Sequence, residues 1–168
     1  MKRDDVLKTI KGAEECPGNA GVIKVPLEVF HQTAEALRND PQSPMDFLRD
    51  IVGMDWGEEG LGAVYFMEST ATGEQIALRT ATADRETPLL PTVSDLWKTA
   101  LIKEREVYDF FGIRFTGHPD MRRLFLREDW IGWPLRKDYD MNSNPLRLDN
   151  EINADFTKEY RLRKDGTL

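Results

Sequence analysis

The chain has 168 residues and a mass of 19.3 kDa, the size of one domain with a short additional segment. Its net charge of −7 and pI of about 5.0 disfavour general nucleic-acid binding, because a phosphate backbone would be repelled on average. One cysteine and two histidines exclude an internal disulfide and leave no Cys/His cluster for zinc or an iron–sulfur centre. We expect the cysteine, Cys16, to be an inert thiol in a loop or at a helix end.

No apolar run approaches the roughly 20 residues that span a bilayer, so we expect membrane association only through a partner. The opening residues, MKRDDVLKTI, lack the apolar region of a signal peptide and carry two acids that import peptides avoid. The sequence therefore predicts an intracellular, unprocessed chain.

The N-terminal half is expected to alternate short helices and strands. Apolar residues at helical spacing predict an amphipathic helix over residues 2–13, and CPGNAG ends it. The residues VIKVP predict a strand, and Pro26 can open a helix over residues 27–38. His31 lies beside the apolar stripe of that helix, so we expect it at the surface or at the edge of the packed side, and not as a ligand.

A brief helix is then predicted over residues 45–51. Residues 61–70 and 74–83 are typical of two strands that form a hairpin, with Gly73 available for a positive φ. After a loop with two prolines, a long helix is predicted over residues 94–111, capped by its first or second residue. The fold class is α+β, with a small mixed or antiparallel sheet covered by helices and followed by an extended C-terminal arm.

Glu104 occupies an unusual position on the long helix. Advancing each residue by about 100° places it in the middle of a broad apolar face, which we expect to pack on the sheet. A buried carboxylate requires a cation or several donors. We therefore expect an arginine from beyond Gly112 as its partner, with these candidates: Arg114, Arg122 and Arg123. Ile102 and Phe110 lie on the opposite side of the helix with Glu106 and Asp109, so we expect a second covered face.

From Gly112 to Tyr139 the sequence follows no period. GHPD is expected to form a turn, with Pro119 opening one helical turn through DMRRLF. A hydrolase that uses His118, Asp120 and Glu104 is a weaker alternative, because no Gly-flanked serine or metal-ligand spacing accompanies them. Basic residues among aromatic ones could also bind RNA, but interspersed acids nearly cancel their charge. Mixed charge around aromatic residues favours a protein–protein interface.

The same stretch carries a family resemblance. EREVYDFFGIRFTGHPDMRRLF, followed by DWIGWPLRKDY, resembles the signature of the 30-kDa subunit, or C subunit, of proton-pumping NADH:quinone oxidoreductase, respiratory complex I. The resemblance is strong over residues 97–139 and otherwise covers only the order and size of elements. The chain departs from the family at Trp133, where histidine is common, and at Asp140, where proline is common. These departures bear only on how the chain turns there.

The resemblance implies a set of signature and subunit-interface residues. They are Glu104, Arg105, Glu106, Asp109, Phe110, Gly112, Phe115, Gly117, His118, Pro119, Asp120, Arg122, Arg123, Trp130, Gly132, Pro134, Leu135, Arg136, Lys137, Asp138 and Tyr139. It implies no catalytic, cofactor or metal residue in this chain, and it places FMN, iron–sulfur clusters and quinone in partner subunits.

The resemblance further implies a non-catalytic structural subunit of the peripheral arm, on the cytoplasmic face of the cell membrane. Its partners would be the 49-kDa-type quinone-site subunit and the terminal iron–sulfur-cluster subunits. A homologous subunit of a membrane-bound hydrogenase, or of a ferredoxin- or coenzyme-dependent relative, remains an alternative, because the motif does not reveal the electron donor.

We divide the chain into a core domain, residues 1–115, and a partner-binding segment, residues 116–168. We call residues 116–139 the strap and residues 140–168 the tail. The tail is polar and thinly apolar, so it is either a disordered end or an arm that becomes ordered on a partner; its widely spaced apolar residues favour the arm.

Overall fold

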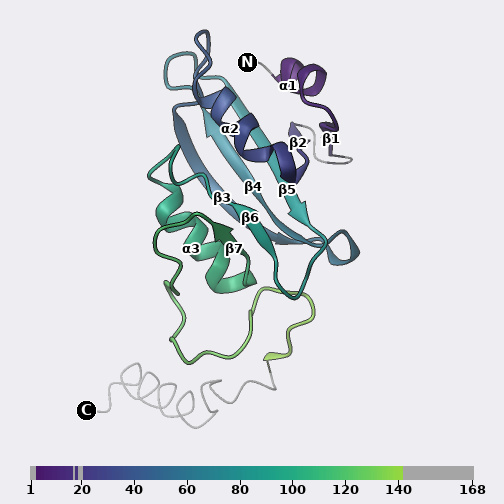
Figure 1. Ribbon diagram of the computed structural model, residues 1–168, viewed down its shortest axis with the longest axis vertical. Helices are drawn as coiled ribbons and strands as arrows, with labels where there is room; N and C mark the ends of the chain where they lie inside the picture. Colours follow the sequence, from purple (N-terminus) through teal and green to yellow (C-terminus); the bar gives the residue numbers. More distant parts are fainter. Residues whose placement is uncertain (1–2, 17, 19–20, 142–168) are drawn as a thin grey trace, which may run out of the picture.

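The computed structural model describes residues 3–16, 18 and 21–141 of the chain (Figure 1). Its helices and strands follow one another in this order: α1 (Arg3–Thr9), β1 (Glu14–Glu15), β2 (Val22–Lys24), η1 (Leu27–Val29), α2 (Phe30–Arg38), β3 (Phe47–Asp55), η2 (Gly57–Glu59), β4 (Leu61–Glu68), β5 (Gln75–Thr82), β6 (Leu89–Pro91), α3 (Ala100–Phe111) and β7 (Arg114–Thr116). The predicted α+β class is confirmed.

The main sheet has five strands in the order β1-β2-β5-β4-β3. The β4–β5 hairpin forms where the sequence predicts it, and Gly73 in its turn has φ 71°. All neighbouring strands are antiparallel except β2 and β5, which run parallel, so the sheet is mixed. The strand β3 lies at one edge.

Both long helices cover the same face of this sheet, and α2 crosses in front of it in Figure 1. The ring of Phe30 on α2 packs on Tyr65 of β4, with centroids 4.6 Å apart. On the same face, the position of a Cβ on Gly53 would lie 2.5 Å from the Phe111 ring of α3, so the missing side chain lets α3 approach β3. The core therefore lies between the sheet and the two helices.

The predicted helix over residues 45–51 is wrong, because this segment enters the edge strand β3. Its buried and exposed residues alternate, as on a half-buried strand, apart from an irregularity between Leu48 and Asp50. A short apolar run does not distinguish a buried strand from a helix, and here pairing with β4 decides.

The long helix begins at Ala100, six residues later than its predicted start, and no side chain caps it. Asp95, one of the two expected caps, instead accepts a hydrogen bond from His31 of α2 at 2.9 Å. Trp97 donates its indole N–H to the Met45 carbonyl at 2.9 Å. Tertiary contacts therefore hold residues 94–99 as turns. His31 lies at the surface, as predicted.

The chain does not leave the domain at Gly112. Strand β7 pairs in parallel with β6 in a second, two-stranded sheet, and Ile113 and Phe115 are buried in the core. The expected helical turn after Pro119 is absent from the described structure, where residues 120–126 form no helix. Residues 142–168, most of the tail, lie outside the described residues, so the division at residue 115 and the behaviour of the tail stay predictions.

In the part of the chain described here, no helix is long and apolar enough to cross a membrane.

Candidate subunit interface: the strap and its two carboxylate anchors

The first anchor of the strap is Asp109, a fully buried carboxylate on α3. Its Oδ1 accepts a hydrogen bond from Arg123 Nη1 at 2.9 Å. Its Oδ2 accepts three backbone N–H groups, from Leu124 at 3.0 Å, Phe125 at 2.6 Å and Leu126 at 2.9 Å. Burial by itself raises the pKa of this carboxyl, but the amide and guanidinium donors outweigh it and lower the pKa below its usual range. The strap thus folds around one buried negative charge.

Arg123 connects this anchor to the later part of the strap. Its guanidinium also donates to the backbone carbonyls of Asp109 at 3.0 Å, Trp130 at 3.0 Å and Gly132 at 3.3 Å. Arg105, one turn earlier on α3, donates to the carbonyls of Arg122 at 3.1 Å and Arg123 at 2.9 Å. Two arginines therefore satisfy strap carbonyls that no regular secondary structure pairs.

Trp133 lies where the strap returns to the end of α3. Its ring packs on Tyr108, with centroids 5.2 Å apart, and the Arg123 guanidinium lies 4.6 Å from its centroid. Gly112 ends α3 with φ 70°, and a Cβ there would lie 2.4 Å from the Trp133 ring. Only glycine satisfies both the backbone conformation and the close contact.

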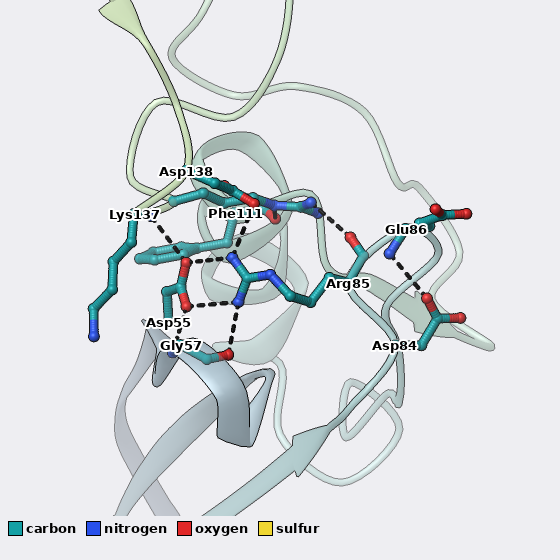
Figure 2. A network of polar contacts seen from close by, with 9 residues as sticks. Asp55, Gly57, Asp84, Arg85, Glu86, Phe111, Lys137 and Asp138 are labelled. Carbon is teal, nitrogen blue, oxygen red and sulfur yellow. Dashed lines mark hydrogen bonds and ion pairs between the residues drawn. The ribbon is translucent and has the colours of Figure 1, made fainter.

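The second anchor is Asp55, at the end of β3 (Figure 2). Arg85 binds both of its carboxylate oxygens at 2.8 Å and also contacts Asp138 at 3.1 Å. The backbone N–H of Lys137 donates to Asp55 Oδ2 at 2.9 Å. The Arg85 hydrogen bonds, helped by this amide, hold the pKa of Asp55 well below its usual range, and Asp55 in turn raises the pKa of Arg85.

Arg136 completes this second attachment. Its Nε donates to the Phe111 carbonyl at 2.6 Å, and its Nη1 donates to the Arg85 carbonyl at 2.7 Å. The end of α3, the loop after β5 and the end of the strap thereby meet at one point, as Figure 2 shows. Burial lowers the pKa of Arg136 from its usual value.

The predicted arginine partner of Glu104 is wrong, although its predicted burial is confirmed. The carboxylate accepts hydrogen bonds from the Thr92 hydroxyl at 2.6 Å and the Val93 amide at 2.7 Å. Burial outweighs these donors and raises the pKa of Glu104 to about 7. The three candidate arginines are engaged elsewhere: Arg114 over the Tyr108 ring, Arg122 with Asp120, and Arg123 with Asp109.

Asp109 lies on the side of α3 away from the sheet, as expected, and this second side is covered by the strap. Asp109 is buried because the strap returns across it. Phe110 is covered by Phe125, whose ring stacks on it at 5.8 Å, and its carbonyl accepts the Leu135 amide at 3.1 Å. The second covered face of the helix is therefore confirmed for Phe110, whereas Ile102 remains 50% exposed.

His118, Asp120 and Glu104 do not form an acid–base set. His118 accepts the Asp120 amide at Nδ1 and contacts the Leu101 carbonyl through Nε2 at 3.2 Å, so the neutral ring carries its proton on Nε2. Burial lowers the pKa of His118, which favours this neutral form. The Asp120 carboxylate binds Arg122, and Glu104 binds Thr92 and Val93. Each group is engaged separately.

The remaining signature residues support the course of the chain. Glu106 pairs with Lys103 at 3.1 Å, and the Tyr139 hydroxyl donates to the Ile131 carbonyl at 3.1 Å. Gly117 and Gly132 adopt positive φ, and the Tyr139 ring packs over Gly132. The other signature residues differ in burial: Phe115 is buried, Trp130 and Pro134 are half-buried, and Pro119 is exposed.

Sequence reasoning missed Asp55, Arg85 and Thr92. Asp55 could have been found, since it continues the alternating buried positions of β3 and an acid there requires partners. Arg85 lies in a loop 30 residues from Asp55 and 53 from Asp138, and no local pattern marks it.

Apolar side chains lie on the outside of the strap. Phe125 is 64% exposed, Ile131 58% and Leu135 54%. Large exposed apolar residues on a segment that is held by buried charges are typical of a surface that contacts another protein. Within residues 3–16, 18 and 21–141, no group of three or more His, Cys, Asp or Glu side chains could hold a metal ion.

The fold and the site thus define a small α+β domain with a strap preorganised by two buried carboxylates. Residues 23–145 match the family model for the respiratory-chain NADH dehydrogenase 30-kDa subunit, and the chain belongs to this family. It is 56% identical to the C/D subunit of NADH-quinone oxidoreductase from Phocaeicola vulgatus over 146 residues, which are 87% of this chain and 28% of that protein.

The chain thus spans little more than a quarter of the length of this C/D protein. Two further proteins are similar to the chain over most of their own length. The C subunit of NADH-quinone oxidoreductase from Roseiflexus castenholzii is 37% identical over 137 residues, 80% of this chain and 78% of that protein. A chain in the structure of the membrane-bound sulfane sulfur reductase, an archaeal respiratory membrane complex, is 26% identical with a TM-score of 0.65, covering 82% of this chain and 83% of that one.

Proposed function

We propose that the chain is a non-catalytic structural subunit of the peripheral arm of an NADH–quinone oxidoreductase. In such an assembly, electrons pass from NADH through FMN and iron–sulfur clusters in other subunits to quinone, with coupled proton translocation. This chain holds none of these cofactors and supports the subunits that do.

The observation that carries the proposal is the preorganised strap. Asp109 holds the middle of the strap and Asp55 holds its C-terminal part through backbone amides, so its course is set before a partner binds. Preorganisation lowers the entropy cost of association, and the exposed Phe125, Ile131 and Leu135 supply apolar contact area.

The partners we propose are the 49-kDa-type quinone-site subunit and the terminal iron–sulfur-cluster subunits. The relatives named as C/D subunits support a direct contact, because one polypeptide there carries two subunits of the complex. The chain would reach the cytoplasmic face of the membrane through these partners.

The test is purification of the intact complex through a tag on this chain. We expect co-purified chains to include an NADH-oxidising flavin subunit, and we expect the separately expressed chain to show no absorption band above about 350 nm. Absence of any respiratory subunit, or a stoichiometric flavin in the isolated chain, would contradict the proposal.

A second candidate is the equivalent subunit of a relative that uses another electron donor. The similarity to a chain of the sulfane sulfur reductase complex supports this second candidate. The same purification discriminates, because the co-purified electron-input subunits would then lack an NADH-oxidising flavoprotein.

A further inference from the structure

The buried carboxyl group of Glu104 is joined to a chain of two hydroxyl groups. Its Oε2 lies 2.6 Å from the Thr92 hydroxyl oxygen, which lies 2.8 Å from the hydroxyl oxygen of Ser94. Glu104 is fully buried, Thr92 is 9% exposed and Ser94 is half-buried. The three oxygens therefore form a continuous series of short hydrogen bonds from the core to the surface of the domain.

The Thr92 hydroxyl has three partners, which fill its hydrogen-bonding capacity. A hydroxyl donates one hydrogen bond and accepts two. The backbone N–H of Ser94 donates to Thr92 at 3.1 Å, so the single hydroxyl proton of Thr92 points either to Glu104 or to the Ser94 oxygen. Oε1 of Glu104 accepts the Val93 amide at 2.7 Å, which makes Oε2 the oxygen that carries the proton of the neutral acid.

Both protonation states of Glu104 satisfy this chain of hydroxyls. In the neutral state, Oε2–H donates to Thr92, Thr92 donates to Ser94, and the Ser94 proton points outward. In the ionised state, Ser94 donates to Thr92 and Thr92 donates to Oε2. Each state contains two hydrogen bonds along the chain and leaves no hydroxyl of the chain without a partner. Protonation therefore reverses the direction of these bonds without costing one of them.

The groups around Glu104 allow it to exchange a proton near neutral pH. Burial is the main cause that raises the pKa of Glu104 to about 7, and the negative charge of Asp95 acts in the same direction. Asp95 itself accepts a hydrogen bond from His31. Burial, together with the charge of Glu104, raises the pKa of Tyr65 on β4 well above its usual value, so Tyr65 keeps its proton. Glu104 can therefore change its charge while Tyr65 stays neutral.

We propose that Glu104 is an internal proton-binding site and that the hydroxyls of Thr92 and Ser94 form its path to solvent. On release, Oε2 gives its proton to Thr92, Thr92 gives its own proton to Ser94, and Ser94 gives its own to a solvent water molecule. Each hydroxyl loses one O–H bond and gains another, so both end neutral and turned toward Glu104. Uptake follows the same steps in reverse, from a protonated water molecule. The site exchanges its proton without opening of the domain, and this inference does not depend on the proposed function.

The first test measures how fast Glu104 loses its proton after a rapid rise of pH through 7. The signal is the infrared C=O band of the neutral carboxyl group in the full chain, identified by its absence from Glu104→Gln. Ser94→Val and Ser94→Thr add side chains of nearly equal size that differ in the hydroxyl group. We expect Ser94→Thr to keep the wild-type rate and Ser94→Val to be at least about tenfold slower, because release then requires local opening. Equal rates in these two variants would overturn the proposal.

An independent variant, Thr92→Val, removes the inner hydroxyl and keeps the shape of the side chain. Its control is Thr33→Val, which removes another buried hydroxyl, on α2, that donates to the Val29 carbonyl at 2.8 Å. We expect proton release to be at least about tenfold slower in Thr92→Val and unchanged in Thr33→Val, with both chains folded by circular dichroism.

The equilibrium titration separates the proton path from a structural role of Thr92. Loss of the Thr92 hydrogen bond raises the pKa of Glu104 further, so release rates are compared at the same distance in pH from the titration midpoint of each variant. A structural role would shift the midpoint of Thr92→Val and leave the rate at matched distance unchanged, and that result would overturn the proposal.

Discussion

Arg123 holds Asp109 in a buried ion pair, with Nη1 2.9 Å from Oδ1, and the same carboxylate binds the next three backbone amides of the strap. An arginine and the amides that follow it thus wrap one carboxylate, in the manner of an anion-binding turn. The direction in which the strap crosses α3 is set by this contact.

Replacing Arg123 by Ala should open the strap. Asp109 would keep its amide donors but lose its counter-charge, and breaking a buried pair costs about 3–5 kcal/mol. Urea unfolding of the chain measures the loss, and limited proteolysis should show new cleavage between residues 123 and 132. Arg127→Ala, which breaks the exposed pair with Asp129, is the control and should leave both unchanged.

Replacing Asp55 by Asn should loosen the C-terminal part of the strap. The amide side chain would keep the shape of the carboxylate but lose the charge bound by Arg85, which would cost about 2 kcal/mol. Hydrogen exchange at Lys137, whose amide donates to Asp55, should rise while that of Leu124 stays slow. Equal acceleration at both amides would mean that the two anchors open as one unit.

Gly112→Ala should be more damaging than Gly73→Ala. The two glycines have nearly the same φ, 70° and 71°, but a Cβ at Gly112 would strike the Trp133 ring, whereas nothing lies within 4 Å of one at Gly73. The loss of stability in Gly73→Ala therefore measures the backbone strain alone, about 1–2 kcal/mol. The additional loss in Gly112→Ala measures the clash between the new Cβ and the Trp133 ring. Thermal unfolding of both variants gives the difference, and equal losses would exclude a steric role for Trp133.

Glu104 should make stability fall as pH rises. Its folded pKa of about 7 lies above its ordinary value of 4.5, so between these values the folded chain binds more protons than the unfolded chain. The unfolding free energy should decrease by about 3 kcal/mol from pH 4.5 to 7 through this group and then level off. Glu104→Gln, which resembles the neutral acid, should remove that decrease.

The difference between wild type and Glu104→Gln isolates this effect from other titrating groups. His118, with a lowered pKa, contributes in the opposite direction below pH 6.5, equally in both proteins. The lowered pKa values of Asp55 and Asp109 cost stability only as pH falls below about 4, where an unfolded aspartate becomes protonated. Parallel pH profiles of the two proteins would refute the burial-induced shift of Glu104.

The sequence by itself determined the features that depend on local period and residue type. Two strand-like segments joined by a turn with a glycine predicted the β4–β5 hairpin, and helical spacing predicted that Glu104 is buried on α3. The ERE-to-KDY signature predicted the family, because many residue types at fixed offsets constrain identity without any knowledge of contacts.

Only the tertiary structure decided which charges meet. Helical spacing gives the direction of a side chain from its own axis but not what lies opposite, so Glu104 was assigned an arginine and its actual partner is the loop at Thr92 and Val93. Asp109 was placed on a second face that was expected to be covered, but only the structure shows that the strap covers it and that Arg123 and three backbone amides bind its carboxylate. Asp55, Arg85 and Asp138 meet from three distant segments, and such a meeting depends on the path of the whole chain through space, which no local pattern of residues records.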